Sequence, residues 1–599
     1  MSFIKVFFAS VLGFFSSIVL VVLLSFGVIA AIIASVDSEE APRVRTNSVL
    51  VIDLSKSYPE YNSTEGFAEI TGGGDVTLRE LAASVRAAAT DERIAGIRLK
   101  STGSPGTWAS AEEIRRALEA FRQSGKFVIA TIGDHGVAEG SYYVASAAET
   151  IIAVPGSQVE LNGIAAVLPF FKTALDRLGI QAQIVRAGSF KSAVEPFILD
   201  SASAETKMMT REIVDGTFSM FRATVAKARK ISPTTLQQML STRGFLSAEE
   251  ARQAKLIDAV MYEDQIDSVL RARADVGIDS DVHTISIGEY KRVAEVGESE
   301  RGGENQIAVV YAVGEIAPGK SGRGNNPLSG GEKLGSTTFS DAMRTARKSK
   351  SVKAVVVRIS SPGGEAGPSE AMWREIKLTA AEKPVIASMG SVAASGGYFL
   401  AAACDTIVAE ATSITGSIGV FGMWFTTREM MTEKLGINLQ VIRSDSLADM
   451  LSMMRAPTDL ERSIVQRSVD STYQKFLRIV SEGRGISMAN ADALGQGRVY
   501  TGTRAKQLNL VDEIGGLDRA VEIAASQAGL GDDSYHVRVL PEARSFIDVL
   551  TEMFDETSLA ASIRSFFGSP TDVAAAVIAE LSKRSGVQML APTFQIDVN

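Results

Sequence analysis

The sequence predicts an α/β protein whose body is a tandem duplication of one β/α unit, with an N-terminal transmembrane helix ahead of it. Three observations predict this class. Several stretches recur about 256 residues later, apolar strand-like runs alternate with helical ones in both copies, and no charged residue lies between Lys5 and Asp37. A chain of 599 residues with 45% apolar residues is long enough for about two to four domains with sizeable cores.

The transmembrane helix is predicted from the uncharged stretch at residues 6–36. A helix of about 20 apolar residues spans a bilayer, whereas a cleavable signal peptide has an apolar region of only about 7–15 residues. We therefore expect residues 1–46 to form an uncleaved anchor that contacts membrane lipid through residues 6–36. The charges do not decide its orientation, because Lys5 precedes this stretch and Arg43 and Arg45 follow it.

The duplication rests on three pairs of similar stretches that occur in the same order. The longest pair shares 8 of 18 residues at a spacing of 256, and the other two pairs are spaced by 257 and 259. The pairs are 136–153 with 392–409, 178–186 with 435–443, and 93–100 with 352–359. Because ordered matches at nearly constant spacing do not arise by chance, the sequence predicts repeat 1 over residues 47–304 and repeat 2 over residues 305–540.

Each repeat begins with an apolar run and then alternates helical and strand-like segments, a pattern typical of parallel β/α/β units. The predicted strands are 48–54, 95–100, 126–132, 306–313, 354–360 and 383–389, and the predicted helices include 111–122 and 369–380. A polar, Gly-rich stretch at 292–305 is expected to link the repeats. Residues 541–599 form a predicted helical tail, because their apolar residues recur at helical spacing.

Several other motifs do not indicate a function. Residues 314–321, GEIAPGKS, match the P-loop pattern, but the Gly, Asn and Pro residues that follow cannot begin the helix that such a loop needs. The three histidines His135, His283 and His536 are scattered, so a metal site is not expected. Only His135 is a candidate for a catalytic base, because it lies four residues before Glu139 in repeat 1. Cys404 lies in an alanine run and is expected to be a small core residue. We therefore expect no metal or cofactor, and the net charge of −9 argues against a nucleic-acid partner.

Ser395 is the candidate nucleophile, and only repeat 2 has it. It lies between small residues and a Gly-Gly pair, where repeat 1 has Glu139. The small neighbours are expected to leave room for a substrate to reach the hydroxyl. Glycines let backbone N–H groups face a ligand closely, so the N–H of Gly396, with that of Gly363 or Gly364, forms a candidate oxyanion hole.

Lys191 is the candidate base, and only repeat 1 has it, since repeat 2 has Ala448 at the corresponding position. Each repeat therefore lacks the half of the pair that the other keeps, which predicts a composite Ser/Lys site between the repeats. Lysine acts as a base only when neutral, and lowering its pKa from about 10.4 to about 7–8 requires about 4 kcal/mol of disfavoured charge. Desolvation can supply this.

The neighbours of Lys191 suit a lowered pKa. Five of them are apolar, namely Phe190, Ala193, Val194, Pro196 and Phe197. Glu195 would oppose the shift if it faced the amine, so we expect it to point away. Ser417 is a candidate supporting residue that orients the amine, and repeat 1 has Leu161 in its place. A turn or cap serine is the alternative interpretation of Ser417.

These motifs, AASGGYF and SFKSAVEPF, together with the N-terminal anchor and the duplicated body, resemble the signal peptide peptidase A (protease IV) family in its long form. The resemblance implies a Clp-protease/crotonase-type fold, a Ser/Lys dyad at Ser395 and Lys191, and a homotetramer. It also implies anchoring in a bacterial inner membrane with the body on the periplasmic side, and degradation of hydrophobic signal peptides left after secretion. Whether the two dyad residues meet within one chain or across subunits stays open.

Two other functions compete with the peptidase hypothesis. Crotonase-like folds also bind acyl-CoA, usually with carboxylates at the site, and Glu139 occupies the position where one would lie. Alternatively, the chain is an inactive membrane scaffold whose dyad is a relic.

Overall fold

The computed structural model describes residues 43–62, 75–277, 280–294, 305–323, 331–531, 534–542 and 586–591, together with residues 13, 595 and 596. The expected membrane span at residues 6–36, apart from Gly13, lies outside the described residues, as do residues 543–585 of the expected tail. Among the helices that are described, none is both long enough and apolar enough to cross a bilayer.

Repeat 1 forms a parallel sheet of six strands in the order β10-β1-β2-β3-β4-β9. The strands are β1 (Ser48–Asp53), β2 (Ile94–Lys100), β3 (Phe127–Ile132), β4 (Thr150–Ala153), β9 (Ala259–Val260) and β10 (Thr284–Ser286). β3, with the sequence FVIATI, is buried along its whole length, as expected of a parallel strand covered on both faces. Beside this sheet, β5 (Gln158–Glu160) pairs with β8 (Phe245–Ser247).

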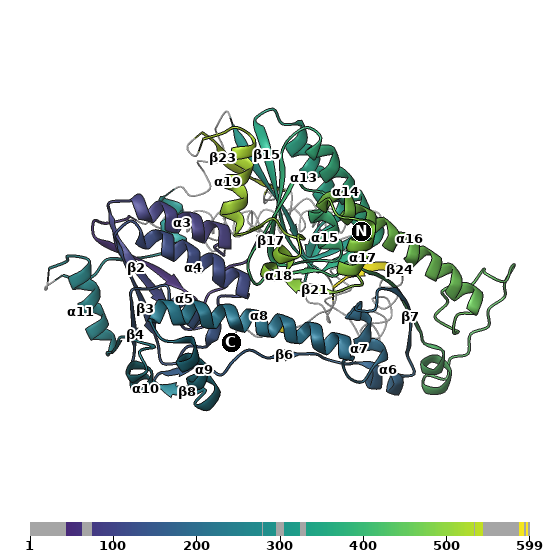
Figure 1. Ribbon diagram of the computed structural model, residues 1–599, viewed down its shortest axis with the longest axis horizontal. Coiled ribbons are helices and arrows are strands. Elements are labelled where there is room, and N and C mark those ends of the chain that lie inside the picture. Colours follow the sequence, from purple (N-terminus) through teal and green to yellow (C-terminus); the bar gives the residue numbers. More distant parts are fainter. Residues whose placement is uncertain are drawn as a thin grey trace, which may run out of the picture.

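Some helices of repeat 1 pack on this sheet, and others lie away from it toward repeat 2 (Figure 1). They are α3 (Leu78–Thr90), α4 (Trp108–Arg122), α5 (Glu139–Ala145), α6 (Lys172–Leu178), η1 (Ser192–Val194), α7 (Glu195–Ile198), α8 (Ala204–Arg229), α9 (Pro233–Thr242), α10 (Ala248–Gln253), α11 (Glu263–Arg273) and α12 (Ile287–Val293). Ser203 caps the start of α8, because its side chain accepts the N–H of Thr206. Its Met209 and Ile213 pack against Val499 of repeat 2, so the helix joins the two repeats.

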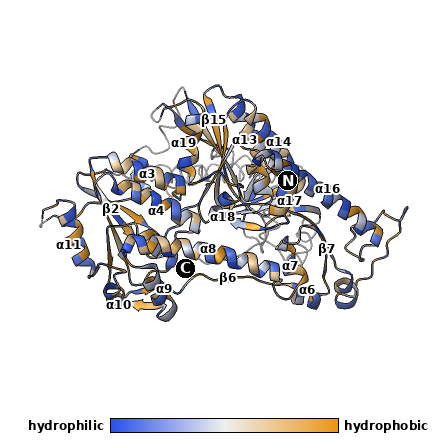
Figure 2. Ribbon diagram, viewed as in Figure 1, coloured by the Kyte–Doolittle hydropathy of each residue, from blue (hydrophilic) through white to orange (hydrophobic). Residues whose placement is uncertain are grey.

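Repeat 2 has the corresponding sheet, in the order β21-β19-β17-β15-β11-β23, with β18 paired to β17 and β22 paired to β18. The strands are β11 (Gln306–Val313), β15 (Val352–Ser361), β17 (Val385–Ala394), β18 (Thr406–Ala409), β19 (Ile414–Gly416), β21 (Val499–Thr501), β22 (Glu513–Ile514) and β23 (His536–Leu540). The helical segments are α13 (Ser336–Lys348), α14 (Ala366–Ala380), α15 (Gly396–Ala401), η3 (Met430–Lys434), α16 (Asp459–Arg484), α17 (Met488–Leu494), α18 (Gly502–Gln507) and α19 (Leu517–Gln527). Figure 2 shows that hydrophobic residues concentrate in the strands of both repeats and that the outer helices carry hydrophilic ones. All eight segments predicted by residue range in the two repeats are therefore present.

A third sheet combines strands from both repeats and from the tail, in the order β13-β14-β12-β16-β24-β20-β7. Its strands are β7 (Gln181–Ala187), β12 (Glu315–Ala317), β13 (Gly322–Arg323), β14 (Glu332–Gly335), β16 (Gly363–Glu365), β20 (Val420–Thr426) and β24 (Gly586–Leu590). A further tail strand, β25 (Gln595–Ile596), pairs with β6 (Ala166–Val167). The sequence analysis predicted helices in the tail and did not predict these two strands.

A cluster of buried charges lies where α4 of repeat 1 meets the sheet of repeat 2. The Arg358 guanidinium donates to Glu60 at 2.8 and 3.0 Å and to Glu113 at 2.6 Å. Arg116 donates to both carboxylate oxygens of Glu410, at 2.9 and 2.5 Å. Each ion pair therefore joins the first half of the chain to the second.

Burial in this seam changes the acidity of its carboxyl groups. Desolvation raises the pKa of Glu113 to about 8 and that of Glu410 to about 7. The pKa of Glu112 is raised for the same reason, although its carboxylate accepts the N–H groups of Ala411 and Thr412.

Candidate active site

Ser395 lies at the sharp junction between β17 and α15. Its backbone has φ of 54° and ψ of −114°, and a positive φ is uncommon for a residue with a side chain. The Ser395 N–H donates to the carbonyl of Gly416 at 2.8 Å. The strand and the helix are both buried, so the surrounding structure holds this strained turn in place.

Lys191 reaches Ser395 from the other repeat of the same chain. It follows β7, the strand of repeat 1 that pairs with β20 of repeat 2. Its Nζ lies 2.8 Å from Ser395 Oγ and 3.0 Å from both the Oγ and the carbonyl oxygen of Ser417. The structure therefore brings Lys191, Ser395 and Ser417 together, within one chain.

The Lys191 amine is held in a desolvated position. Its side chain is fully buried, and burial lowers the pKa of Lys191 well below its usual value near 10.5. Glu195 points away, as expected, because its carboxylate accepts hydrogen bonds from the N–H and hydroxyl of Ser203 and from the hydroxyl of Thr206. The Glu195 carboxylate therefore stabilises the first turn of α8 and does not face the Lys191 amine.

Two glycines enclose Lys191, and the sequence analysis did not find them. A Cβ on Gly497 would come within 2.6 Å of the Lys191 Cα, and a Cβ on Gly419 would come within 3.2 Å of its Cδ. In the same loop, the carbonyl oxygen of Gln496 accepts the N–H of Phe190 at 2.8 Å. A glycine-rich run, GQGR at 495–498, was the available signal, but its sequence position does not reveal that it packs on Lys191.

The three glycines proposed as an oxyanion hole are placed differently from one another. Gly363 lies beside Gly396, because a Cβ on Gly363 would stand 2.6 Å from the Gly396 nitrogen. In this structure the Gly363 N–H donates to Ser361 Oγ at 3.2 Å. Both glycines belong to β16, where Gly363 is paired with Leu590 and Gly364 with Met589 of β24, and Gly364 is also paired with Ile316 of β12. The positions of Gly363 and Gly396 thus fit a shared anion site better than that of Gly364.

The expectation of an accessible hydroxyl is wrong for this structure. Ser395 is fully buried despite its small neighbours. The Met589 carbonyl oxygen of β24 lies against the neighbouring Gly363, only 1.9 Å from where a Cβ would be. A tail strand thus lies beside one of the glycines of the candidate oxyanion hole.

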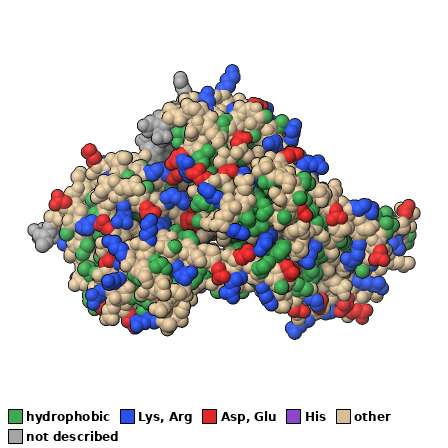
Figure 3. Space-filling view, in the orientation of Figure 1, with side chains coloured by type: hydrophobic (Ala, Val, Ile, Leu, Met, Phe, Trp, Pro, Cys, Tyr) green, Lys and Arg blue, Asp and Glu red, His purple; other side chains and the backbone are tan. Residues whose placement is uncertain are grey.

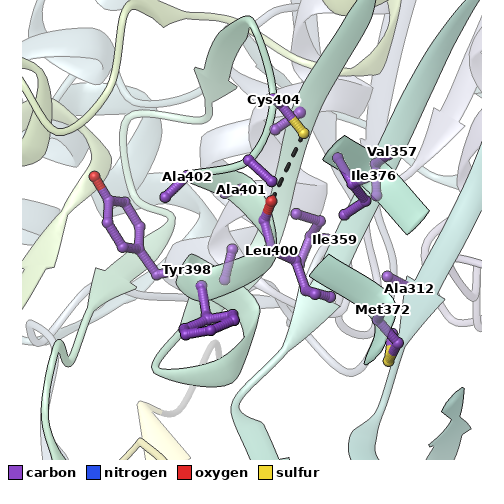
Figure 4. Close-up of a cluster of buried hydrophobic side chains, with 14 of the residues drawn as sticks. Ala312, Val357, Ile359, Met372, Ile376, Tyr398, Leu400, Ala401, Ala402 and Cys404 are labelled. Atoms are coloured by element: carbon purple, nitrogen blue, oxygen red, sulfur yellow. Dashed lines mark hydrogen bonds between the residues drawn. The ribbon is translucent and has the colours of Figure 1, made fainter. Parts of the chain in front are cut away.

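The remaining sequence candidates have structural roles or lie elsewhere. The Glu139 carboxylate accepts the N–H groups of Asn162 and Gly163 at 2.5 and 2.6 Å, so it organises its own loop. His135 is exposed in the turn after β3. Cys404 is buried in the core of repeat 2 with its Sγ 3.8 Å from the Leu400 carbonyl, as Figure 4 shows. The P-loop-like residues 314–321 include β12 and lead into β13, with no helix between the two.

Comparison with known proteins identifies the family of this site. The profile of Peptidase family S49 matches residues 120–279 and 377–531, one segment in each repeat. The chain belongs to peptidase family S49. It is therefore a serine peptidase, in a form that carries the family domain twice.

Two long relatives are similar in sequence to most of this chain. "Serine protease SPPA, chloroplastic" of Arabidopsis thaliana is 34% identical over 490 residues, which cover 82% of this chain and 70% of the relative. "Protease 4" of Salmonella typhi is 33% identical over 488 residues, covering 80% and 76%. A shorter relative, "Putative signal peptide peptidase SppA" of Enterococcus faecium, is 30% identical over 234 residues, covering 39% of this chain and 67% of the relative. The resemblance stated from the motifs is thus confirmed at the level of the family.

Proposed function

We propose that this S49 peptidase cleaves peptide bonds with Ser395 as the nucleophile and Lys191 as the general base. The observation that carries the proposal is the 2.8 Å separation of Lys191 Nζ and Ser395 Oγ inside a fully buried site. A neutral amine has two N–H groups and one lone pair. The two oxygens of Ser417 accept the N–H groups, which leaves the lone pair for the Ser395 hydroxyl proton.

The reaction follows from these positions. Lys191 Nζ takes the hydroxyl proton as Ser395 Oγ bonds to the peptide carbonyl carbon, and the carbonyl oxygen becomes an oxyanion that the N–H groups of Gly396 and Gly363 bind. When the C–N bond breaks, Lys191 returns the proton to the leaving amine. Water then attacks the acyl-enzyme, Lys191 takes a proton from it, and the acid product leaves as Ser395 Oγ regains a proton.

The substrate and cellular setting are also part of the proposal. We infer that the substrates are hydrophobic peptides, including cleaved signal peptides, because a relative carries the name signal peptide peptidase. The N-terminal stretch at residues 6–36 is also apolar enough to anchor the chain in a membrane that holds such peptides. From the family resemblance we infer a Clp-protease/crotonase-like unit in each repeat, a homotetramer, and a single-pass anchor in a bacterial inner membrane with the body on the periplasmic side.

The test is cleavage of a hydrophobic signal peptide in detergent by the full-length chain and by Ser395→Ala at equal concentration. We expect the wild type to cut and the variant to fall to background. Cys404→Ala is the matched control, since it alters a buried small residue near α15 without touching the dyad. Equal cleavage by wild type and Ser395→Ala would show that Ser395 is not the nucleophile.

A further inference from the structure

Lys191 is unusual among the lysines of this chain because the fold keeps it away from water. Lysine normally leaves its charged end in solvent, and Figure 3 shows Lys and Arg side chains spread over the surface of one face of the molecule. The Lys191 side chain is instead fully buried, with its Nζ 2.8 Å from Ser395 Oγ. Holding a long, flexible side chain at that distance requires a rigid setting. The loop at residues 495–498, here called the clamp loop, supplies part of it.

The clamp loop contacts both the lysine segment and the residue that orients the amine. The Gln496 carbonyl oxygen accepts the N–H of Phe190, the neighbour of Lys191, at 2.8 Å. On the other side of the loop, the Arg498 carbonyl oxygen accepts the N–H of Ser417 at 2.7 Å. Ser417 in turn provides the two oxygens that lie 3.0 Å from the Lys191 amine. The position of one short loop therefore sets the positions of the base and of its acceptors.

Gln496 takes a left-handed backbone conformation, with φ of 56°, at a place where glycine would fit without strain. Glycine occupies both neighbouring positions, so an interaction of the Gln496 side chain must offset the strain here. Its Oε1 accepts the N–H of Ser189 at 3.3 Å, and its Nε2 donates to Asp492 Oδ1 at 2.6 Å. The carboxamide therefore joins the lysine segment of repeat 1 to α17 of repeat 2.

The Tyr473 hydroxyl completes this network. Tyr473 is buried on α16, which packs beside α17 (Figure 1), and its hydroxyl donates to Asp492 Oδ1 at 2.6 Å. The same hydroxyl oxygen accepts the Gln496 backbone N–H at 3.0 Å and lies 3.3 Å from Gln496 Nε2. Because these groups satisfy one another, loss of the hydroxyl would release the clamp loop from α16.

Repeat 1 has the corresponding helices but not the three residues of the network. VDGTF at 214–218 on α8 matches VDSTY at 469–473 on α16 at a spacing of 255, and both helices have 26 residues. None of the three positions holds the same residue in repeat 1, where they are Phe218, Gln237 and either Ser241 or Thr242. Repeat 1 therefore has neither the tyrosine hydroxyl nor the carboxylate at these places.

The backbone frame around the loop is nevertheless the same in both repeats. Leu161, the counterpart of Ser417, donates its N–H to the Gly244 carbonyl at 2.8 Å, as the Ser417 N–H does to Arg498. The strands are also paired alike, since β8 is antiparallel to β5 and β21 is antiparallel to β19. The frame thus does not need the network, which accompanies Ser395 in repeat 2 and is replaced in the repeat that has Glu139 instead.

We propose that Tyr473, Asp492 and Gln496 are positioning residues that fix Lys191 as the general base. The network holds the clamp loop against the lysine segment, which keeps the Lys191 amine at hydrogen-bonding distance from Ser395 and away from water. The three residues do not touch the reacting atoms and act through Lys191. This inference rests on the proposed function, because it concerns the reaction of that dyad.

The first test is Tyr473→Phe, which removes only the hydroxyl, assayed with the full-length protein and a hydrophobic signal peptide in detergent. We expect kcat to fall by roughly 10- to 100-fold with KM nearly unchanged, because the base is displaced and the substrate contacts are not. Burial lowers the pKa of Lys191, so a loosened loop that admits water should also move the rise of kcat with pH to higher pH.

Tyr142→Phe is the matched control for this variant. Tyr142 is also buried, and its hydroxyl donates to the Leu256 carbonyl at 2.6 Å inside repeat 1. Its loss should lower the melting temperature without moving the pH profile. A Tyr473→Phe enzyme whose pH profile coincides with that of the wild type would overturn the inference, even if its melting temperature fell.

Gln496→Gly separates positioning from folding. Glycine takes a φ of 56° without strain, which offsets the lost side-chain hydrogen bonds, so the melting temperature should change little while kcat falls as in Tyr473→Phe. Because both variants break one network, the double variant should be no slower than the slower single variant. Wild-type kcat in Gln496→Gly, or losses that multiply in the double variant, would contradict a shared positioning role.

The failure of this inference is distinguishable from the failure of the proposed function. If Ser395→Ala or Lys191→Met cuts at the wild-type rate, the dyad fails and the positioning role falls with it. If both are inactive while Tyr473→Phe and Gln496→Gly behave like the wild type, the dyad stands and the positioning network alone is overturned.

Discussion

Lys191 Nζ and Ser395 Oγ lie 2.8 Å apart although 204 residues separate them along the chain. The lysine follows a strand that leaves its own repeat to pair with β20, and the serine ends the central strand β17 of the other repeat. The proposed active site therefore takes one residue from each repeat, since repeat 1 has Glu139 where repeat 2 has Ser395 and repeat 2 has Ala448 where repeat 1 has Lys191.

Replacing Lys191 with methionine removes the base but keeps an unbranched apolar side chain in the pocket. We expect the peptidase rate to fall by about 10²–10⁴-fold. Because burying an amine is costly, the melting temperature should not fall. Peptide cleavage and calorimetry on the same preparation check both expectations, and a large drop in melting temperature would indicate that Lys191 is mainly structural.

The peptidase rate should depend on pH through Lys191. The amine is an effective base only when unprotonated, so kcat/KM should rise with pH as Lys191 loses its proton. Since burial lowers the pKa of Lys191 well below 10.5, this rise should be complete well below that pH. A profile still rising steeply near pH 10.5, measured with the same peptide, would contradict a desolvated base.

Gly497→Ala should disturb Lys191 through the backbone. Gly497 has φ of 82°, and an added Cβ would approach the Lys191 Cα within 2.6 Å. Gly125→Ala is a matched control, because Gly125 has φ of 85° with nothing within 4 Å of the added atom. Both variants bear the backbone strain of about 1 kcal/mol, and we expect only Gly497→Ala to lose peptidase activity as well. Equal activity of the two variants would remove Gly497 from the site.

The buried carboxyl of Glu113 should make stability depend on pH. Its pKa rises from about 4.5 in the unfolded chain to about 8 in the fold, so between these values the folded protein holds a proton that the unfolded chain has lost. This contribution to stability is complete below pH 4.5 and is lost as the pH rises through 8. Melting temperature should therefore fall between about pH 4.5 and about pH 8 and level off above that, and Glu113→Gln should flatten the slope.

The exposed Glu205 on α8 provides the comparison for this measurement. Glu205→Gln should leave the slope of melting temperature against pH as in the wild type. A Glu113→Gln protein with an unchanged slope would mean that other groups of the seam carry the proton.

The sequence was sufficient to predict that Ser395 and Lys191 lie together because the duplication supplied an internal comparison. Ser395 against Glu139 and Lys191 against Ala448 are informative only when the repeats are aligned. The strands and helices of each repeat were equally predictable, since parallel strands buried on both faces are continuous apolar runs such as FVIATI.

The sequence did not predict which distant strands pair with one another. Nothing local in residues 181–187 shows that β7 leaves its own repeat, because a strand's partner is decided by distant contacts such as those with β20. The same holds for β24, which lies in a tail with helical periodicity and which pairs with β16 beside the candidate site. Gly497 was missed because a glycine's role depends on what approaches it.

The buried ion pairs of Arg358 with Glu60 and Arg116 with Glu410 also bear on how the two halves could have been inherited. A separate half would expose unpaired charges and an incomplete sheet, and losing one partner of a buried pair costs about 3–5 kcal/mol. A nick within residues 295–304 should therefore leave two fragments that co-purify and still cut peptide. Gene fission would be tolerated only if both products were made together, so the single reading frame keeps the halves at equal dosage.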